Sequence, residues 1–146
     1  MKIAIASDHA AYDLKEYLLD WLKSQNYEVF DFGTFSVESC DYPDFAYPAA
    51  EAVSKGEANF GIIVCGSGIG MSIVCNKVKG IRAANCLTPE MAELARLHNN
   101  ANILNMGSRL IDFDTAKAIT VTFLNTKFEG GRHSLRVEKI HSKTGC

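Results

Sequence analysis

The sequence lacks the features that would place the chain in a membrane or mark it as a nucleic-acid-binding protein. No apolar run approaches the length needed to span a bilayer. The first residues, Met1 to Ala6, turn polar too soon for a secretory signal. The formal net charge is −2, without the positive excess that nucleic-acid-binding proteins carry. We therefore expect a cytoplasmic protein with neither a membrane nor a nucleic acid as partner.

The sequence also lacks the cysteine spacing of a disulfide framework or a zinc site. Its five cysteines are an odd number, and no two of them form a Cys-x-x-Cys pair. They are Cys40, Cys65, Cys75, Cys86 and Cys146. The simplest interpretation is reduced thiols in the cytosol, with no metal bound.

Several nucleotide and phosphatase signatures are missing as well. A nucleotide P-loop ends in Gly-Lys-Ser/Thr, whereas this chain has Gly70-Met71-Ser72. The glycines 66, 68 and 70 are spaced by two throughout, which differs from the dinucleotide fingerprint G-x-G-x-x-G. A cysteine phosphatase loop would need arginine where Met71 stands.

What the 146 residues do contain is a regular alternation of strand and helix patterns, with no repeat or linker, as expected for a single domain. The predicted strands are 3–7, 28–32, 62–64, 82–86 and 103–106. The predicted helices are 11–22, 45–54, 70–77, 89–98, one that begins at Asp112 or Asp114, and 132–141. Thr88 is expected to cap the helix from Pro89. Such alternation predicts an α/β fold whose parallel sheet is covered on both faces.

Two polar segments follow predicted strands, and they could face one crevice. If the strand order is 2-1-3-4-5, the order reverses between strands one and three, where α/β proteins bind ligands at the carboxyl ends of strands. Asp8-His9 and the segment 65–70 would meet there. Asp8 has an equally good interpretation as a helix cap.

The segment 65–70 is the most distinctive part of the chain. Cys65 ends a strand and enters a turn with Gly66, Gly68 and Gly70. A glycine-rich turn between a strand and a helix exposes N–H groups that bind anions and favour a thiolate. Cysteine alone is more often a small buried packing residue. The closely spaced glycines favour a binding loop.

Further candidates lie in the second half of the chain. His98 lies at the C-terminal end of the helix that begins at Pro89. The C-terminus of a helix favours the charged form of an imidazole, which suits acid–base chemistry. A histidine on an apolar stripe, however, is as often a structural residue. Arg132 and Arg136 are spaced i, i+4 and suit a phosphate, whereas solvated surface arginines are the default. Arg109, after Gly107-Ser108, is a weaker candidate.

Taken together, these motifs resemble the type B ribose-5-phosphate isomerase family, with its allose- and galactose-6-phosphate relatives. The matching stretches are Ser7-Asp8-His9, Asp41-Tyr42-Pro43, Cys65-Gly66-Ser67-Gly68-Ile69-Gly70, Asn76-Lys77, Gly80-Ile81-Arg82-Ala83, His98-Asn99 and Gly130-Gly131-Arg132-His133. They stand in family order over nearly the whole chain.

The resemblance implies a Rossmann-like three-layer α/β/α sandwich and a homodimer, sometimes paired into tetramers, with the active site between subunits and helix 132–141 contributing to the dimer. It implies interconversion of ribose 5-phosphate and ribulose 5-phosphate in the non-oxidative pentose phosphate pathway, without metal or organic cofactor. Cys65 would be the base, Ser67 and the glycine turn would hold the enediolate oxygen with Asp8 nearby, and His98 would open the furanose ring.

The residues that the resemblance assigns to substrate binding are His9, Tyr42, Gly66, Gly68, Gly70, Asn99, Arg109, Arg132 and Arg136. Of these, His9, Arg132 and Arg136 would contact the phosphate with help from Arg109, and Tyr42 would line the pocket.

The sequence leaves other interpretations open. Some family members lack the cysteine and use a glutamate at the position of Met71, so the resemblance is to the branch of the family that uses the cysteine. Many members have threonine where Ser67 stands, which keeps the hydroxyl. Galactose-6-phosphate isomerases divide these catalytic and binding residues between two unlike subunits, whereas this chain has all of them. A preference for allose 6-phosphate or another 6-phosphate sugar, and a non-catalytic sugar-phosphate sensor, are the alternatives.

Overall fold

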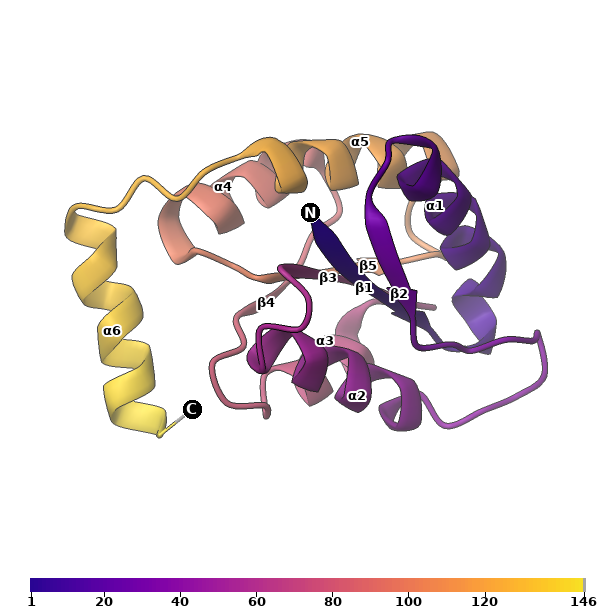
Figure 1. Ribbon diagram of the computed structural model, residues 1–146, viewed down its shortest axis with the longest axis horizontal. Coiled ribbons are helices and arrows are strands. Elements are labelled where there is room, and N and C mark those ends of the chain that lie inside the picture. The colour runs from indigo at the N-terminus through magenta and orange to yellow at the C-terminus, as the bar shows by residue number, and fades with distance from the viewer. Residues whose placement is uncertain (146) are drawn as a thin grey trace.

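The protein, described over residues 1–145 by a computed structural model, is organised around one five-stranded sheet (Figure 1). The strands are β1 (Lys2–Ser7), β2 (Glu28–Asp31), β3 (Phe60–Cys65), β4 (Ala83–Asn85) and β5 (Ile103–Gly107). Every neighbouring pair is parallel. This confirms the predicted parallel sheet of five strands.

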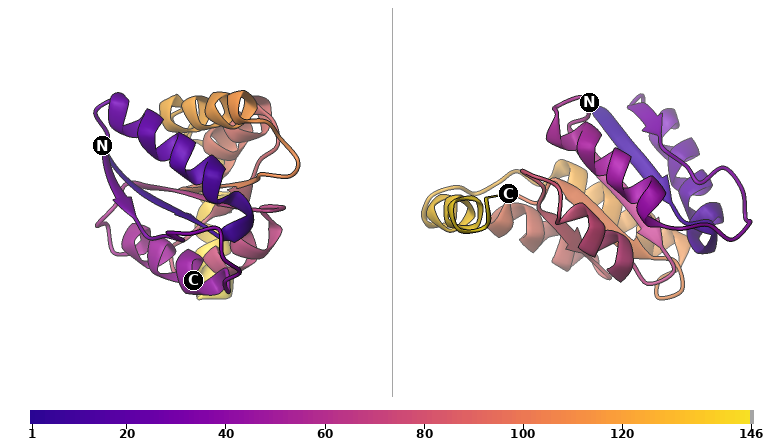
Figure 2. Two further views of the ribbon diagram at one scale, coloured as in Figure 1. Left: turned by 90° about the vertical axis from the view of Figure 1, so that its right-hand side faces the viewer. Right: turned by 90° about the horizontal axis from the view of Figure 1, so that it is seen from below.

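Helices cover both faces of the sheet, so the expected three-layer sandwich is confirmed as well. The helical elements are η1 (His9–Ala11), α1 (Tyr12–Ser24), α2 (Pro43–Ser54), α3 (Ile69–Cys75), α4 (Pro89–Asn99), α5 (Phe113–Asn125) and α6 (Arg132–Thr144). One core cluster joins α1, α4 and α5 to the sheet, and a second joins α2 and α3 to its other face. Figures 1 and 2 show these two helical layers.

The strand order 2-1-3-4-5, on which the predicted crevice was based, was wrong at one edge of the sheet. The order is β2-β1-β3-β5-β4, so β5 and not β4 lies beside β3. The burial of the two strands gives the physical reason: every residue of β5 is buried, whereas every residue of β4 is only half-buried. A strand buried on both faces belongs inside a parallel sheet, and a short, less buried strand suits the edge. The reversal between β1 and β3 is confirmed.

Two predicted helix starts are confirmed by hydrogen bonds. The Thr88 hydroxyl accepts from the N–H of Met91 at 3.2 Å. Of the two candidates for α5, Asp112 is the cap, since its carboxylate accepts from the N–H of Thr115 at 2.7 Å. Both bonds satisfy N–H groups that the first turn of a helix leaves unpaired.

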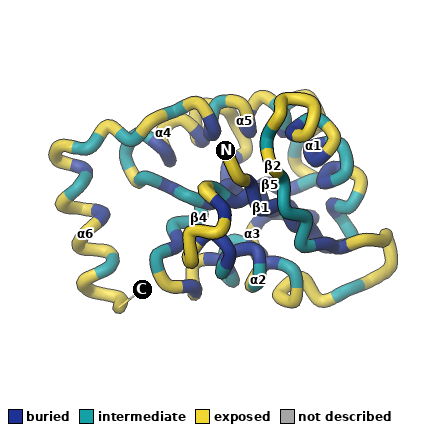
Figure 3. Tube along the Cα trace, viewed as in Figure 1, coloured by how far each residue is buried: buried dark blue, intermediate teal, exposed yellow. Residues whose placement is uncertain are grey.

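Helix α6 stands apart from both layers. Figures 1 and 2 show it projecting from one end of the molecule, and Figure 3 shows that most of it is exposed. Only His133 and Val137 of this helix are buried. Among residues 1–145, no helix is long and apolar enough to cross a membrane.

Candidate functional site

The carboxyl ends of β1 and β3 open into a cavity of about 410 Å³. The residues that line it are Asp8, His9, Ala10, Tyr42, Cys65, Gly66, Ser67, Gly70, Arg109 and Leu110. The structure therefore brings together two segments predicted to share a crevice, and adds Tyr42 and Arg109 from two other loops.

The thiol of Cys65 is held at the wall of this cavity. Its side chain is almost fully buried, and the N–H of Gly68 donates to its Sγ at 3.1 Å. An N–H aimed at sulfur stabilises negative charge there. The Ser67 hydroxyl accepts from the N–H of Ile69 at 3.3 Å. One N–H of the turn thus points at the sulfur, and a second holds the neighbouring Ser67 hydroxyl.

The turn can take this shape only because it contains glycine. Gly68 has φ of 76°, and a Cβ there would lie 2.2 Å from Oδ1 of Asn85. A Cβ on Gly70 would lie 3.0 Å from the ring of Tyr42. Across the sheet, a Cβ on Gly107 would lie 2.7 Å from the backbone of Ser67. These approaches leave no room for side chains at the three positions, so the turn lies close against β5 and Tyr42.

Two other thiols are chemically quiet. Burial raises the pKa of Cys75 to about 12 and that of Cys86 to about 11. Both therefore stay protonated at neutral pH. Cys40 is half-buried at the cavity's edge, with Sγ at 3.8 Å from Nδ1 of His9. Only Cys65 among the described cysteines lines the cavity.

The acid and base after β1 have different surroundings. Oδ1 of Asp8 is buried and has no hydrogen-bond partner in the described part of the chain. Since a buried carboxylate oxygen without a partner is costly, it suits a hydroxyl of a bound ligand. Nδ1 of His9 accepts from the N–H of Cys40 at 3.3 Å. That bond assigns the ring proton to Nε2 and leaves a donor for an anion.

Arg109 approaches the turn from the loop after β5. The backbone N–H of Arg109 donates to the Gly66 carbonyl at 3.1 Å, and the backbone N–H of Ser108 donates to the Cys65 carbonyl at 2.9 Å. A Cβ on Gly66 would lie 3.3 Å from the guanidinium carbon of Arg109. The guanidinium therefore lies against the turn at Gly66, and Arg109 and Cys65 line the same cavity.

Four predicted residues lie elsewhere in the chain. They are His98, Asn99, Arg132 and Arg136. His98 and Asn99 end α4, while Arg132 and Arg136 are exposed on α6. In an α/β fold the helices end at the amino edge of the sheet, opposite the carboxyl ends of the strands. Strand β3 has six residues, so the two edges are more than about 15 Å apart.

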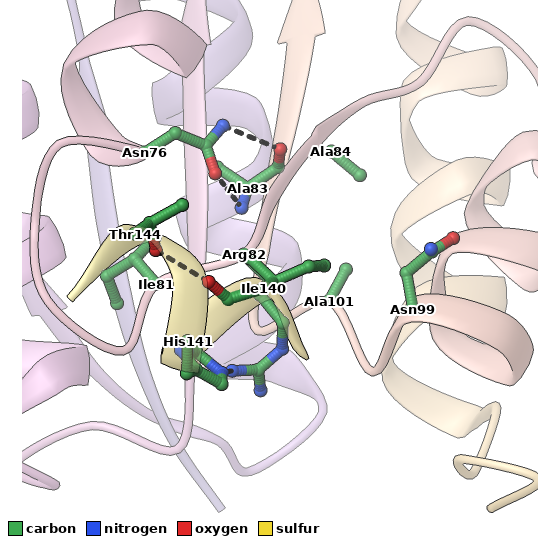
Figure 4. A pocket seen from close by; sticks show the side chains of 10 residues that line it. All are labelled: Asn76, Ile81, Arg82, Ala83, Ala84, Asn99, Ala101, Ile140, His141 and Thr144. Carbon is green, nitrogen blue, oxygen red and sulfur yellow. Dashed lines mark hydrogen bonds between the residues drawn. The ribbon is translucent and has the colours of Figure 1, made fainter. Parts of the chain in front are cut away.

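A second cavity, of about 380 Å³, lies between α6 and the β4 edge (Figure 4). Asn99 and Arg82 line it, together with Ile140 and His141 from α6. The guanidinium of Arg82 lies 2.9 Å from Nε2 of His141. The cavity adjoins the end of α4, not the Cys65 cavity.

Sequence reasoning gave no role to Glu129 and His133, which lie against His98. Ligand atoms of His98, Glu129 and His133 all fall within 4.8 Å of one another. The two imidazole rings are stacked, with planes 12° apart. A metal ion lies in the plane of each imidazole that binds it, so stacked rings do not direct two lone pairs at one ion. The motif Gly130-Gly131 beside Glu129 was the available signal.

Comparisons with known proteins find similar chains over nearly the whole length of this one. The family described as Ribose/Galactose Isomerase matches residues 3–140. Ribose-5-phosphate isomerase B of Escherichia coli is 45% identical over 139 residues, covering 95% of this chain and 93% of that protein. A structure of ribose-5-phosphate isomerase B from Clostridium thermocellum has a TM-score of 0.98 at 52% identity, covering 99% of this chain and 98% of that one. One from Mycoplasma genitalium, with bound ribulose-5-phosphate, has a TM-score of 0.95 at 40% identity, covering 99% of this chain and 96% of that one.

Proposed function

Because the chain belongs to the ribose/galactose isomerase family, we propose that it interconverts ribose 5-phosphate and ribulose 5-phosphate through an enediolate. The observation that carries this proposal is the thiol of Cys65 in the cavity, with an N–H at 3.1 Å from its sulfur. The unpartnered Oδ1 of Asp8 beside it supports a ligand rich in hydroxyls. Similarity to a structure with bound ribulose-5-phosphate supports the choice of sugar.

In the proposed reaction, Cys65 moves one proton between neighbouring carbons. The thiolate takes the C2 proton of open-chain ribose 5-phosphate, and the C–H electron pair forms the C1–C2 double bond of the enediolate. The electron pair of the C1 carbonyl moves onto O1 at the same time. The thiol then returns the proton to C1, and the proton that leaves O2 passes to O1, so that O2 becomes the ketone oxygen and O1 becomes a hydroxyl. Nothing is oxidised or reduced overall, so no co-reactant is needed.

The turn after Cys65 suits the developing negative charge. The N–H of Gly68 is used by the sulfur and that of Ile69 by the Ser67 hydroxyl, which keeps its own proton to donate. A donor fixed in this way stabilises an enediolate oxygen better than mobile water does.

We also propose that the second group of residues acts in the site of a partner subunit. His98 would open the furanose ring, Asn99 would bind the sugar, and Arg132 with Arg136 would hold the phosphate together with His9. Within one chain the two groups lie at opposite edges of the sheet, the length of a strand apart. That distance, more than about 15 Å, is longer than one pentose phosphate can span. A homodimer in which α6 reaches the neighbouring chain removes this separation.

The surface of α6 supports such a dimer. Leu135 is 65% exposed and Ile140 is 44% exposed in a single chain. Apolar side chains on a projecting helix are typical of contacts between subunits. We also propose that residues 1–146 form a single isomerase domain, that its last helix contributes to the dimer, and that the protein acts in the cytoplasm.

The test is a coupled assay for ribulose 5-phosphate formed from ribose 5-phosphate, with allose 6-phosphate in parallel. We expect turnover of ribose 5-phosphate by the native chain, loss of at least about a hundredfold in Cys65→Ala, and little loss in the matched control Cys86→Ala. Near-native turnover by Cys65→Ala would remove the base assignment. Binding of sugar phosphates without turnover or proton exchange would instead favour the sensor.

A further inference from the structure

Three side chains meet where the end of α4, the loop before α6 and the first turn of α6 come together. The rings of His98 and His133 stack with centroids 4.4 Å apart. Oε2 of Glu129 lies 3.5 Å from Nε2 of His133 and 3.8 Å from Nε2 of His98. One carboxylate oxygen therefore faces both rings.

The backbone fixes this carboxylate relative to α4. The N–H of Glu129 donates to the carbonyl of Leu97 at 3.1 Å, one residue before His98. Gly130 and Gly131 then turn the chain with φ of 72° and 54°, which a side chain would oppose. The N–H of His133 donates to the Gly130 carbonyl at 3.0 Å. Glu129 is therefore tied to the helix end that carries His98.

The protonation of His133 decides which ring the carboxylate can serve. Nε of Arg132 donates to Nε2 of His133 at 3.3 Å, so this nitrogen is unprotonated. Burial is the largest cause that lowers the pKa of His133. The neighbouring imidazole of His98 and the guanidinium groups of Arg132 and Arg136 act in the same direction, and Glu129 only partly opposes them. A neutral His133 with no proton on Nε2 cannot donate to Glu129. Of the two rings that face the carboxylate, only that of His98 can then donate to it, through Nε2–H.

Resting on the proposed function, we infer that Glu129 is a positioning residue for ring opening, acting through His98. The carboxylate holds the proton of His98 on Nε2 and leaves Nδ1 free as the base. Nδ1 takes the proton from the anomeric hydroxyl of the furanose, the bond from C1 to the ring oxygen breaks, and the proton returns to that oxygen. Between these two transfers the imidazole is positively charged, and Glu129 balances that charge.

The stacked ring of His133 completes the arrangement. It lies flat against His98, with planes 12° apart, and restricts rotation of the imidazole. The 3.8 Å separation of Glu129 and His98 is an electrostatic contact in the substrate-free chain, and contacts of this kind tighten once the ring is protonated. The carboxylate need not touch the sugar.

The experiment separates ring opening from proton transfer. Ribose 5-phosphate is mostly a furanose, whereas ribulose 5-phosphate is open-chain, because its O5 carries the phosphate and cannot close a five-membered ring. Exchange of the C1 proton of ribulose 5-phosphate in deuterated water therefore reports the Cys65 step alone. We expect Glu129→Gln to lower kcat/KM for ribose 5-phosphate at least about tenfold and to leave exchange within about twofold of native. Glu129→Asp restores much of the loss, and Glu93→Gln, an exposed change on α4, has no effect.

Each outcome decides the matter. Equal loss of isomerisation and exchange in Glu129→Gln would mean that Glu129 maintains the structure of the whole site and has no specific role in ring opening. Native isomerisation in that variant would mean that Glu129 has no role in the reaction. Either result overturns the inference. If the native protein shows neither isomerisation nor exchange, the proposed function itself fails, which is a different result. Thermal unfolding and size measurements on each variant identify any loss that comes from misfolding.

Discussion

Subunit complementation tests the division of the site directly. Cys65 lies in the cavity at the carboxyl edge of the sheet, and His98 lies at the opposite edge. If each site takes Cys65 from one chain and His98 from the other, a Cys65→Ala homodimer and a His98→Asn homodimer both lack an intact site. A mixed dimer differs, because one of its sites carries both substitutions and the other carries neither.

The expected recovery follows from this arrangement. With equal amounts of the two chains and random pairing, about half of the dimers are mixed. Each mixed dimer has one intact site of its two, so the mixture has about a quarter of native activity on ribose 5-phosphate, and purified mixed dimers have about half. If both residues served one site from the same chain, no dimer would contain an intact site.

The assay uses co-expression with two different affinity tags and kinetics on the doubly purified dimer. The matched control pairs Cys65→Ala with Asp8→Asn, since these two residues line the same cavity. In that mixed dimer every site keeps one lesion, and no activity should return. Activity of the Cys65→Ala and His98→Asn mixture no greater than the mean of its homodimers would refute the shared site.

Two further predictions concern the turn and the buried histidine. Gly56 and Gly68 have nearly equal φ, 74° and 76°, but only Gly68 has neighbours that a Cβ would meet, Oδ1 of Asn85 at 2.2 Å and the backbone of Met106 at 2.9 Å. Gly56→Ala should lower the free energy of unfolding by about 1–2 kcal/mol, and Gly68→Ala should cost more and abolish turnover; equal effects in urea unfolding would contradict the contact argument. The pKa of His133 is lowered from its ordinary value of 6.5, so the unfolded chain binds more protons below that pH. The contribution of His133 to the free energy of unfolding should therefore be constant above pH 6.5 and fall on acidification below it, so that stability falls less steeply in His133→Asn. Identical pH dependence in that variant would remove His133 as a cause.

The sequence was sufficient to predict the three layers of the fold and the part of the candidate site that contains Asp8 and Cys65, because both depend on local patterns. Asp8 and Cys65 each follow an apolar strand, and carboxyl ends of parallel strands share one edge of the sheet. The strand order at the other edge was not predictable in this way. Both β4 and β5 are short apolar runs, and only their burial in the folded chain, half-buried against buried, separates edge from centre.

The cluster around His98 marks the limit of sequence reasoning more clearly. Glu129 and His133 are 31 and 35 positions beyond His98, on different elements, and no periodicity relates them. Their meeting depends on the hydrogen bond from Glu129 to Leu97 and on two glycines in the left-handed region. No role can be predicted for a single glutamate before Gly130 until the position of α6 relative to α4 is known.

The separation of Cys65 from His98, in contrast, is a consequence of topology that the order of elements already contains. A residue at the end of a strand lies at the carboxyl edge of a parallel sheet, and a residue at the end of a connecting helix lies at the amino edge. Cys65 is of the first kind and His98 of the second. A reaction that needs both on one sugar therefore cannot be completed within a single chain of this fold. Under the proposed mechanism, association of two chains is a chemical requirement, and the projecting α6 is the element that carries Arg132 and Arg136 across.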